Sequence, residues 1–131
     1  MGHAMNDIKQ VIVVRKDLNL RKTELASQVA TASMGFLLDN NESERNDVIN
    51  VKLSREEAIW LNGSFEKSIV AVESEQDLRD LMFKAEMEGI GVYPVHGKIS
   101  SKFDDLTIMC AALGPDESSV INHVTGHLKS I

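Results

Sequence analysis

Short apolar runs alternate with longer amphipathic stretches along the chain, a pattern that predicts an α/β domain. Four runs are rich in β-branched and other apolar residues and have the length of buried strands; they cover residues 9–14, 67–72, 90–93 and 106–112. After the first run, apolar residues recur with helical spacing and predict a helix over residues 22–38, whose apolar face is Leu25, Val29, Ala32 and Phe36.

Capping residues predict two further helices. Ser54 followed by Glu57 forms a capping box, which predicts a short helix that continues through Leu61. Ser74 is a good N-cap for the most clearly amphipathic helix of the chain, which Gly89 closes. Since this helix lies between two predicted strands, it favours a parallel crossover connection.

The dipeptide Gly114-Pro115 predicts a break between the fourth strand and a last helix. Pro115 and the acidic residues Asp116 and Glu117 suit the first turn of that helix, and Gly126 suits its end. The expected architecture is one four-stranded mixed sheet with helices packed on both faces.

Composition and length limit the classes of protein to consider. The chain has 131 residues and 43% hydrophobic residues, with no apolar run of the 18 or more residues that a membrane span needs. The first four residues, Met-Gly-His-Ala, resemble a tag remnant, so we expect residues 1–5 to be a leader and residues 6–131 to form one domain. A single cysteine and the lack of a secretion signal favour a cytoplasmic location.

The net charge of −6 has the wrong sign for nucleic-acid binding through the overall field, so any such role must rest on a local patch. One patch stands out, with four cations in eight residues directly before a predicted helix: Arg15, Lys16, Arg21 and Lys22. Helix N-termini attract anions, so this segment is a candidate phosphate-binding site. A solvated basic turn is an equally good interpretation.

Ligands in open α/β sheets usually bind beyond the carboxyl ends of parallel strands, which points to the loops after Val14, Val72, Val95 and Leu113. The segment 96–105 has no helical stripe and is expected to be a loop; it contains His96, Lys98 and Lys102. On the helix after the basic segment, a polar stripe could line a cleft or simply face solvent; it consists of Glu24, Gln28 and Thr31.

Other chemistry has little support. His123 and His127 have the spacing of paired metal ligands, but no third ligand is near them and Gly126 separates them, so we expect no metal site. Cys110 lies in an apolar run that favours an inert core thiol. No cofactor-binding motif is present in the sequence.

Several segments together resemble the type II peptidyl-tRNA hydrolases. The most specific match is Gly114-Pro115 followed by Val124-Thr125-Gly126-His127-Leu128-Lys129, and Val13-Val14-Arg15-Lys16-Asp17-Leu18 matches the first strand and turn of that family. The resemblance spans residues 9–131. It implies an α/β fold, hydrolysis of the ester between peptide and tRNA, a tRNA or peptidyl-tRNA partner, and a homodimer.

The departures from the family pattern fall on the chemistry. The family typically has Gly-Lys-Gly-Lys where this chain has Arg21-Lys22-Thr23-Glu24, and a histidine where this chain has Thr31. Its Asp-Ala-Gly segment corresponds to His96-Gly97-Lys98-Ile99-Ser100. Lys22 and Gln28 are retained.

Two functional hypotheses follow from this comparison. In a rearranged hydrolytic site, His96 acts as base, Lys22 or Lys98 stabilises the oxyanion, and Gln28 and Thr31 orient the water. The candidate catalytic residues are therefore Lys22, Glu24, Gln28, Thr31, His96 and Lys98.

The alternative is a catalytically silent relative that binds tRNA or another phosphate ligand, or a protein that retains only the fold. The candidate phosphate-binding residues are Arg15, Lys16, Arg21, Lys22 and Lys102.

Overall fold

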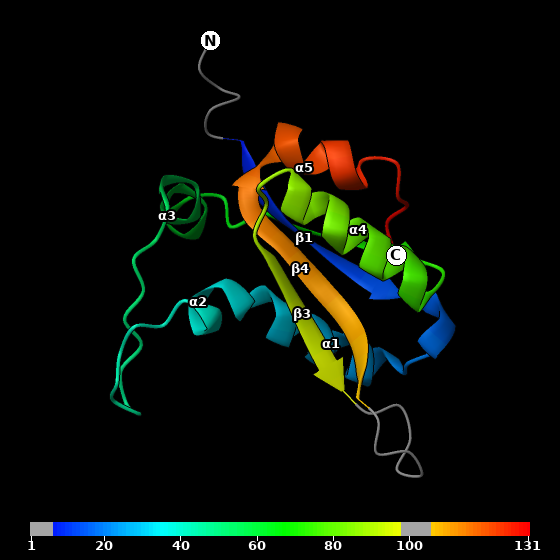
Figure 1. The fold of residues 1–131 in the computed structure, drawn as a ribbon, viewed down its shortest axis with the longest axis horizontal. Coiled ribbons are helices and arrows are strands. Elements are labelled where there is room, and N and C mark those ends of the chain that lie inside the picture. The colour runs from blue at the N-terminus through cyan, green and yellow to red at the C-terminus, as the bar shows by residue number, and fades with distance from the viewer. Residues whose placement is uncertain (1–6, 98–105) are drawn as a thin grey trace.

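A four-stranded mixed sheet forms the centre of the protein (Figure 1). The structure, a computed structural model, describes residues 7–97 and 106–131. Within them the strands are β1 (Ile8–Arg15), β2 (Lys67–Val72), β3 (Val92–Gly97) and β4 (Thr107–Glu117), in the order β2-β1-β4-β3. β1 is parallel to β2 and antiparallel to β4, and β3 is antiparallel to β4. β1, β2 and β3 therefore run in one direction, which confirms the predicted mixed sheet and the shared direction of the strands joined by the 74–89 helix.

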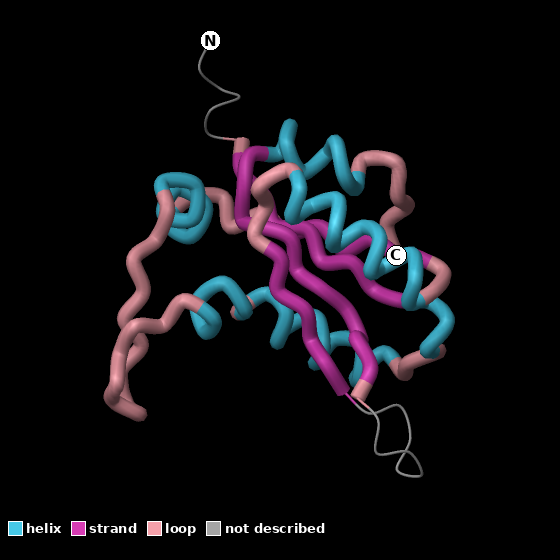
Figure 2. The backbone as a smooth tube through the Cα atoms, in the orientation of Figure 1, coloured by secondary structure: helices cyan, strands magenta, loops and turns pink. Residues whose placement is uncertain are grey.

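Helices cover both faces of the sheet, as Figure 2 shows. α1 (Lys22–Ser33) and α2 (Gly35–Asp39) lie on one face, and α4 (Glu75–Met87) and α5 (Ser118–Thr125) lie on the other. Alternate residues of β1 face the two layers, because side chains alternate along a strand. Val11 and Val13 pack with α4 and α5, whereas Ile12 and Val14 pack with α1.

α3 (Arg55–Asn62) closes one end of the sheet. Its Trp60 is 1% exposed, packs edge-on against Phe36 with ring centroids 5.7 Å apart, and donates from Nε1 to the Glu66 carbonyl at 2.7 Å. The predicted capping box is confirmed, since the Glu57 N–H donates to Ser54 Oγ at 3.0 Å and the Ser54 N–H donates to Glu57 Oε1 at 2.8 Å. This cap sets the start of α3.

The predicted cap of α4 is also confirmed. Ser74 Oγ accepts a hydrogen bond from the Asp77 N–H at 3.1 Å. The helix ends at Met87, and Gly89 has a φ of 79°, a conformation that favours glycine.

The predicted break at Gly114-Pro115 is wrong, because β4 continues through it to Glu117. The register against β1 shifts between Lys9 and Val11, so β4 accommodates one extra residue there as a bulge. Gly114 has a φ of 88°, and a Cβ at this position would lie 2.7 Å from the Asp116 nitrogen. The missing N–H of Pro115 falls at the bulge, where proline is tolerated. α5 therefore begins at Ser118, and Pro115, Asp116 and Glu117 belong to the strand.

Two further predictions need correction. The predicted helix over 22–38 is divided at Met34, whose N–H donates to the Thr31 carbonyl at 3.2 Å in a tighter turn. Gly35 then starts α2 against β3, where a Cβ would lie 2.6 Å from Tyr93 Cβ. β3 extends to Gly97, so His96 lies in a strand and not in a loop. A register shift after Val95 places His96 opposite Ile108 on β4, one residue beyond the position that it would otherwise face.

Candidate functional site

Arg15 lies where the carboxyl end of β1 meets the start of β4. Its Nη1 donates to Thr107 Oγ1 and to the Ile108 carbonyl, both at 2.9 Å, and its Nε and Nη2 donate to the two Asp17 carboxylate oxygens at 3.0 and 2.6 Å. The residue is 9% exposed. The hydrogen bond from Arg15 lowers the pKa of Asp17 below its ordinary value. Four of the five guanidinium N–H groups are thus used within the fold, and phosphate binding by Arg15 stays a prediction.

Only three of the four predicted loops share one edge of the sheet. The loops after Val14, Val72 and Val95 follow strands that run in the same direction. The expectation for Leu113 is wrong, because β4 is antiparallel to β1 and residue 113 lies toward the opposite edge. The site must therefore be sought around the ends of β1, β2 and β3.

A pocket of about 260 Å³ between α1, α2 and β3 brings two predicted site residues together. Thr31 and His96 both line it, and both are exposed. The Thr31 hydroxyl donates to the Ser27 carbonyl at 3.0 Å, so its oxygen remains able to accept a hydrogen bond. Two candidate residues from two separate elements thus border the same pocket.

Gln28 extends this site along α1. Its side chain is half-buried, and a Cβ added at Gly97 would lie 3.9 Å from Gln28 Nε2 and 3.1 Å from Met109 Cγ. The Gln28 amide therefore lies near β3 at Gly97, one residue beyond His96, and the close neighbour of the glycine is Met109. Gln28, Thr31 and His96 form what we call the α1–β3 site.

Two residues of the pocket lining were missed by the sequence analysis, namely Asp39 and Tyr93. Burial raises the pKa of Tyr93, whose side chain is half-buried. Asp39 is the last residue of α2 and begins a polar, acidic stretch that is typical of a solvated loop. No spacing in the sequence connects either residue with Thr31, because the pairing of α2 with β3 is a tertiary contact.

Glu24 and Lys22 have separate environments at the start of α1. Glu24 Oε1 accepts a hydrogen bond from the Arg21 backbone N–H at 3.2 Å, so the carboxylate caps the helix. Lys22 lines an apolar groove on the β2 side of α1, whereas Thr31 lines the pocket on the β3 side. Lys22 and Glu24 are roughly 200° apart around the helix axis. Arg21 is exposed at the N-cap position.

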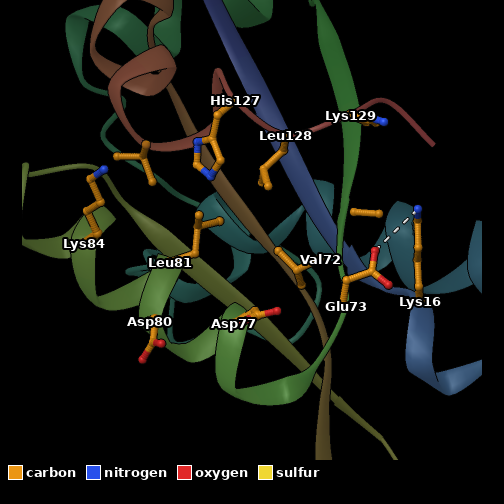
Figure 3. Close-up of a pocket in the computed structure, with 12 residues that line it drawn as sticks. Lys16, Val72, Glu73, Asp77, Asp80, Leu81, Lys84, His127, Leu128 and Lys129 are labelled. Carbon is orange, nitrogen blue, oxygen red and sulfur yellow. Dashed lines mark ion pairs between the residues drawn. The ribbon is translucent and has the colours of Figure 1, made fainter.

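Lys16 lies at a different pocket, on the α4 and α5 face (Figure 3). Its Nζ is 3.6 Å from Glu73 Oε2. This pocket has a volume of about 480 Å³ and also contains the carboxylates of Asp77 and Asp80. In Figure 3 the His127 imidazole lies above Leu81, with these carboxylates on the opposite rim. The three carboxylates are balanced by the three lysines of the lining, Lys16, Lys84 and Lys129, so charge alone does not define the ligand of this pocket.

Lys98 and Lys102 lie outside the described residues. Within residues 7–97 and 106–131, no group of three or more His, Cys, Asp or Glu side chains could hold a metal ion. Cys110 is buried under α1, and burial raises the pKa of its thiol to about 11.

Among the residues that the structure describes, no helix has the length and apolar character needed to cross a bilayer.

The fold and the α1–β3 site define a small α/β protein in which polar groups of the first long helix face an edge strand. The sequence model of the family Peptidyl-tRNA hydrolase PTH2 matches residues 8–131. The chain belongs to this family, which confirms the resemblance seen in the sequence.

Similar proteins from archaea carry the name Peptidyl-tRNA hydrolase. The protein of Nanoarchaeum equitans is 36% identical over 124 residues, which cover 93% of this chain and 97% of the relative. That of Haloquadratum walsbyi is 33% identical over 121 residues, covering 92% and 97%. That of Thermococcus onnurineus is 32% identical over 127 residues, covering 94% and 97%. Family membership over nearly the whole chain supports a peptidyl-tRNA hydrolase-like function.

Proposed function

We propose that this protein hydrolyses the ester bond between peptide and tRNA in peptidyl-tRNA. The observation that carries the proposal is the α1–β3 site, where His96 and Thr31 line one pocket and the Gln28 amide lies near the next residue of the strand. Ester hydrolysis needs a base for the attacking water and groups that orient it. We assign the role of base to His96 and the orienting roles to Gln28 and Thr31.

In the proposed reaction, neutral His96 accepts a proton from water while the water oxygen attacks the ester carbonyl. Gln28 and Thr31 orient the water, and the proton passes to the leaving oxygen of the tRNA when the tetrahedral intermediate collapses. Of the two candidate oxyanion partners, Lys22 lines the opposite side of α1 from Thr31, so Lys98 is the one we propose, in a role often worth about 3 kcal/mol. Glu24 supports the site indirectly by capping α1. Water and side chains suffice for this chemistry, and no cofactor is proposed.

The test is release of an N-acetylaminoacyl group from tRNA by the purified protein. His96→Gln should lower kcat by about 100-fold or more, because a positioned general base typically contributes 10²–10⁴. His123→Gln is the matched control, since His123 is exposed on α5 and belongs to the opposite face of the sheet. An unchanged rate in His96→Gln would contradict the proposed role of His96.

A silent tRNA-binding protein is the second candidate, and one observation favours it. Glu24 places a negative charge at the start of α1, where the family pattern has a lysine. In that case the exposed cations Lys16, Arg21 and Lys22 hold phosphate groups. Each phosphate contact should contribute to a linear fall of log affinity with log salt concentration. Salt-sensitive tRNA binding with no release of the acyl group would support this second function.

We also propose a homodimer and a cytoplasmic location, by analogy with the family. Sedimentation at two protein concentrations tests the dimer, and a monomer at both would contradict it. Phe83 and Met87 form an exposed apolar pair on α4, with 66% and 73% exposure, and are available for such contact. Fractionation of source cells tests the location, and recovery of the protein from a membrane or an extracellular fraction would contradict it.

A further inference from the structure

The pocket that Thr31 and His96 line also contains a carboxylate, that of Asp39. Among the described residues, Asp39 is the one acidic side chain of its lining, and no lysine or arginine is part of it. Apart from Gly35, the rest of the lining is apolar or aromatic: Ala32, Leu38, Tyr93, Pro94 and Val95. A side chain with an apolar stem and a charged end matches this combination of walls and charge.

The pocket has a direction, because the helices follow β3 from one end to the other. Gln28 Nε2 lies 3.9 Å from a Cβ added at Gly97, whereas a Cβ added at Gly35 would lie 2.6 Å from Tyr93 Cβ. The helical residues therefore rise in number as those of β3 fall. His96 and Tyr93 are three residues apart, which corresponds to roughly 10 Å along a strand. One extended side chain can span this distance.

Asp39 lies toward the Tyr93 end of the pocket. It is the last residue of α2, the helix that Gly35 begins against Tyr93. Burial is the main cause of the raised pKa of Tyr93, and the negative charges of Glu57 and Asp39 add to it. The carboxylate is thus near the aromatic ring, at the opposite end of the pocket from His96.

The charge of Asp39 is available to a ligand. Within residues 7–97 and 106–131, the ion pairs of the protein do not include it. An ammonium or guanidinium group would form charge-assisted hydrogen bonds with this carboxylate, and the ring of Tyr93 also attracts cations. A phosphate would be repelled, so the RNA part of the substrate does not suit this end of the pocket.

We propose that this pocket selects a basic side chain, that of lysine or arginine, on the amino acid that is esterified to tRNA. The inference rests on the proposed function and names its substrate class. With the ester carbonyl beside His96, the stem of the side chain follows β3 and its cation reaches Asp39. An unblocked α-amino group cannot do this, because it is bonded to the carbon next to the ester carbonyl and stays at the His96 end.

The test compares three substrates built on one lysine tRNA. Nα-acetyl-lysyl-tRNA carries its cation at the end of the side chain, Nε-acetyl-lysyl-tRNA carries it beside the ester, and the diacetylated form carries none. After subtraction of uncatalysed hydrolysis, kcat/KM should be about tenfold higher for the first than for either of the others. Equal values, or the highest value for Nε-acetyl-lysyl-tRNA, would overturn the proposal.

Asp39→Asn removes the charge and keeps the shape of the side chain. It should lower kcat/KM about tenfold for Nα-acetyl-lysyl-tRNA and leave the diacetylated substrate unchanged, so that the preference disappears. Asp80→Asn is the matched control, because Asp80 is exposed on α4 and is outside this lining; its preference should equal that of the parent. A preference that persists in Asp39→Asn would show that the bulk of the second acetyl group, and not the charge, causes it.

Binding without hydrolysis separates this inference from the proposed function. Nα-acetyl-lysine amide, titrated into the ¹⁵N-labelled full chain, should give saturable shifts at the amides of Asp39, Tyr93 and His96, and Nα,Nε-diacetyl-lysine amide should bind more weakly. Such binding without acyl release would support the pocket and contradict the hydrolysis. Release of the acyl group at equal rates from all three substrates would overturn the pocket alone.

Discussion

Arg15 and Asp17 form a two-point ion pair, with Nε 3.0 Å from Oδ1 and Nη2 2.6 Å from Oδ2. Arg45 and Asp47 repeat the same geometry two residues apart, at 2.9 and 2.7 Å. Their surroundings differ, since the Arg15 side chain is 7% exposed and the Arg45 side chain is 72% exposed. Arg15 also donates to Thr107 on β4, so the first pair joins the end of β1 to another strand.

Replacing these two arginines should therefore have unequal effects on stability. Arg15→Gln leaves the Ile108 carbonyl and the Asp17 carboxylate without their donor and should reduce the free energy of unfolding by about 3 kcal/mol. Arg45→Gln should cost less than about 1 kcal/mol, because the exposed pair is screened by water and salt. Urea denaturation of both variants measures the difference. Equal losses would show that burial of the Arg15–Asp17 pair does not increase its contribution to the free energy of unfolding.

The same ion pair predicts a loss of stability in acid. The hydrogen bond from Arg15 lowers the pKa of folded Asp17 below the ordinary value of 3.8. A carboxyl with a lower pKa in the folded state stabilises the fold above its unfolded pKa, and this contribution is lost as the pH falls through the folded pKa. The free energy of unfolding should thus decline below about pH 4. Asp17→Asn should show a smaller decline over that range, and an identical acid profile would exclude Asp17 as a contributor.

A buried hydrogen-bonded pair holds α1 on β1. Gln10 has no exposed surface, its Nε2 donates to the Ser33 carbonyl at 3.0 Å, and its Oε1 accepts from Ser33 Oγ at 2.6 Å. Ser33→Ala removes the only side-chain donor to Oε1 among the described residues and should cost about 1–3 kcal/mol. Ser27→Ala, at an exposed position of the same helix, should cost less than about 0.5 kcal/mol. If thermal or urea unfolding gave equal losses, the buried pair would have no special role.

The elements that the sequence predicts correctly are those with local signals. The apolar spacing of Leu78, Leu81 and Ala85 predicts α4 correctly, because all three side chains face the sheet. The spacing of Ser54 and Glu57 likewise predicts the start of α3. The path of β4 through Gly114-Pro115 could not be predicted in this way, because pairing with β1 across a bulge outweighs local turn preference. Local propensity is a weak guide where tertiary pairing supplies the hydrogen bonds.

The candidate site shows the same division. The stripe of Glu24, Gln28 and Thr31 follows from helical spacing, and His96 was singled out for its chemistry. That Thr31 and His96 line one pocket depends on β3 extending past Val95 and packing under α1, which no periodicity reveals. The roles assigned to these residues stay predictions until activity is measured.

Cys110 should report opening of the site helix. Its Sγ lies 3.6 Å from the Gln28 carbonyl beneath α1, and burial raises the thiol pKa from 9.0 to about 11. At a given pH near 8 the folded protein therefore holds about 100-fold less thiolate than the unfolded chain. Alkylation by iodoacetamide should be at least about that much slower in the native protein than in urea. Rapid stoichiometric labelling of the native protein would contradict the buried placement of Cys110.

The last prediction concerns restoration of the family pattern at two positions of α1. In Glu24→Lys, Thr31→His, a cation replaces the capping carboxylate and an imidazole replaces the hydroxyl in the pocket with His96. A cation at the helix start and a lost cap should cost about 1 kcal/mol of stability. A cation that contacts the developing oxyanion should nevertheless raise kcat/KM by about 100-fold, the equivalent of about 3 kcal/mol.

The control for this restoration is Thr23→Lys, Thr31→His, which adds a lysine to the same turn roughly 100° away around the helix. N-acetylaminoacyl-tRNA release should increase only in the first double variant, because only residue 24 shares a helix face with Gln28. If both variants gained equally, general attraction of tRNA by the added lysine would explain the increase. An inactive parent with an active Glu24→Lys, Thr31→His variant would favour the silent tRNA-binding function, since activity would then depend on the two replaced side chains.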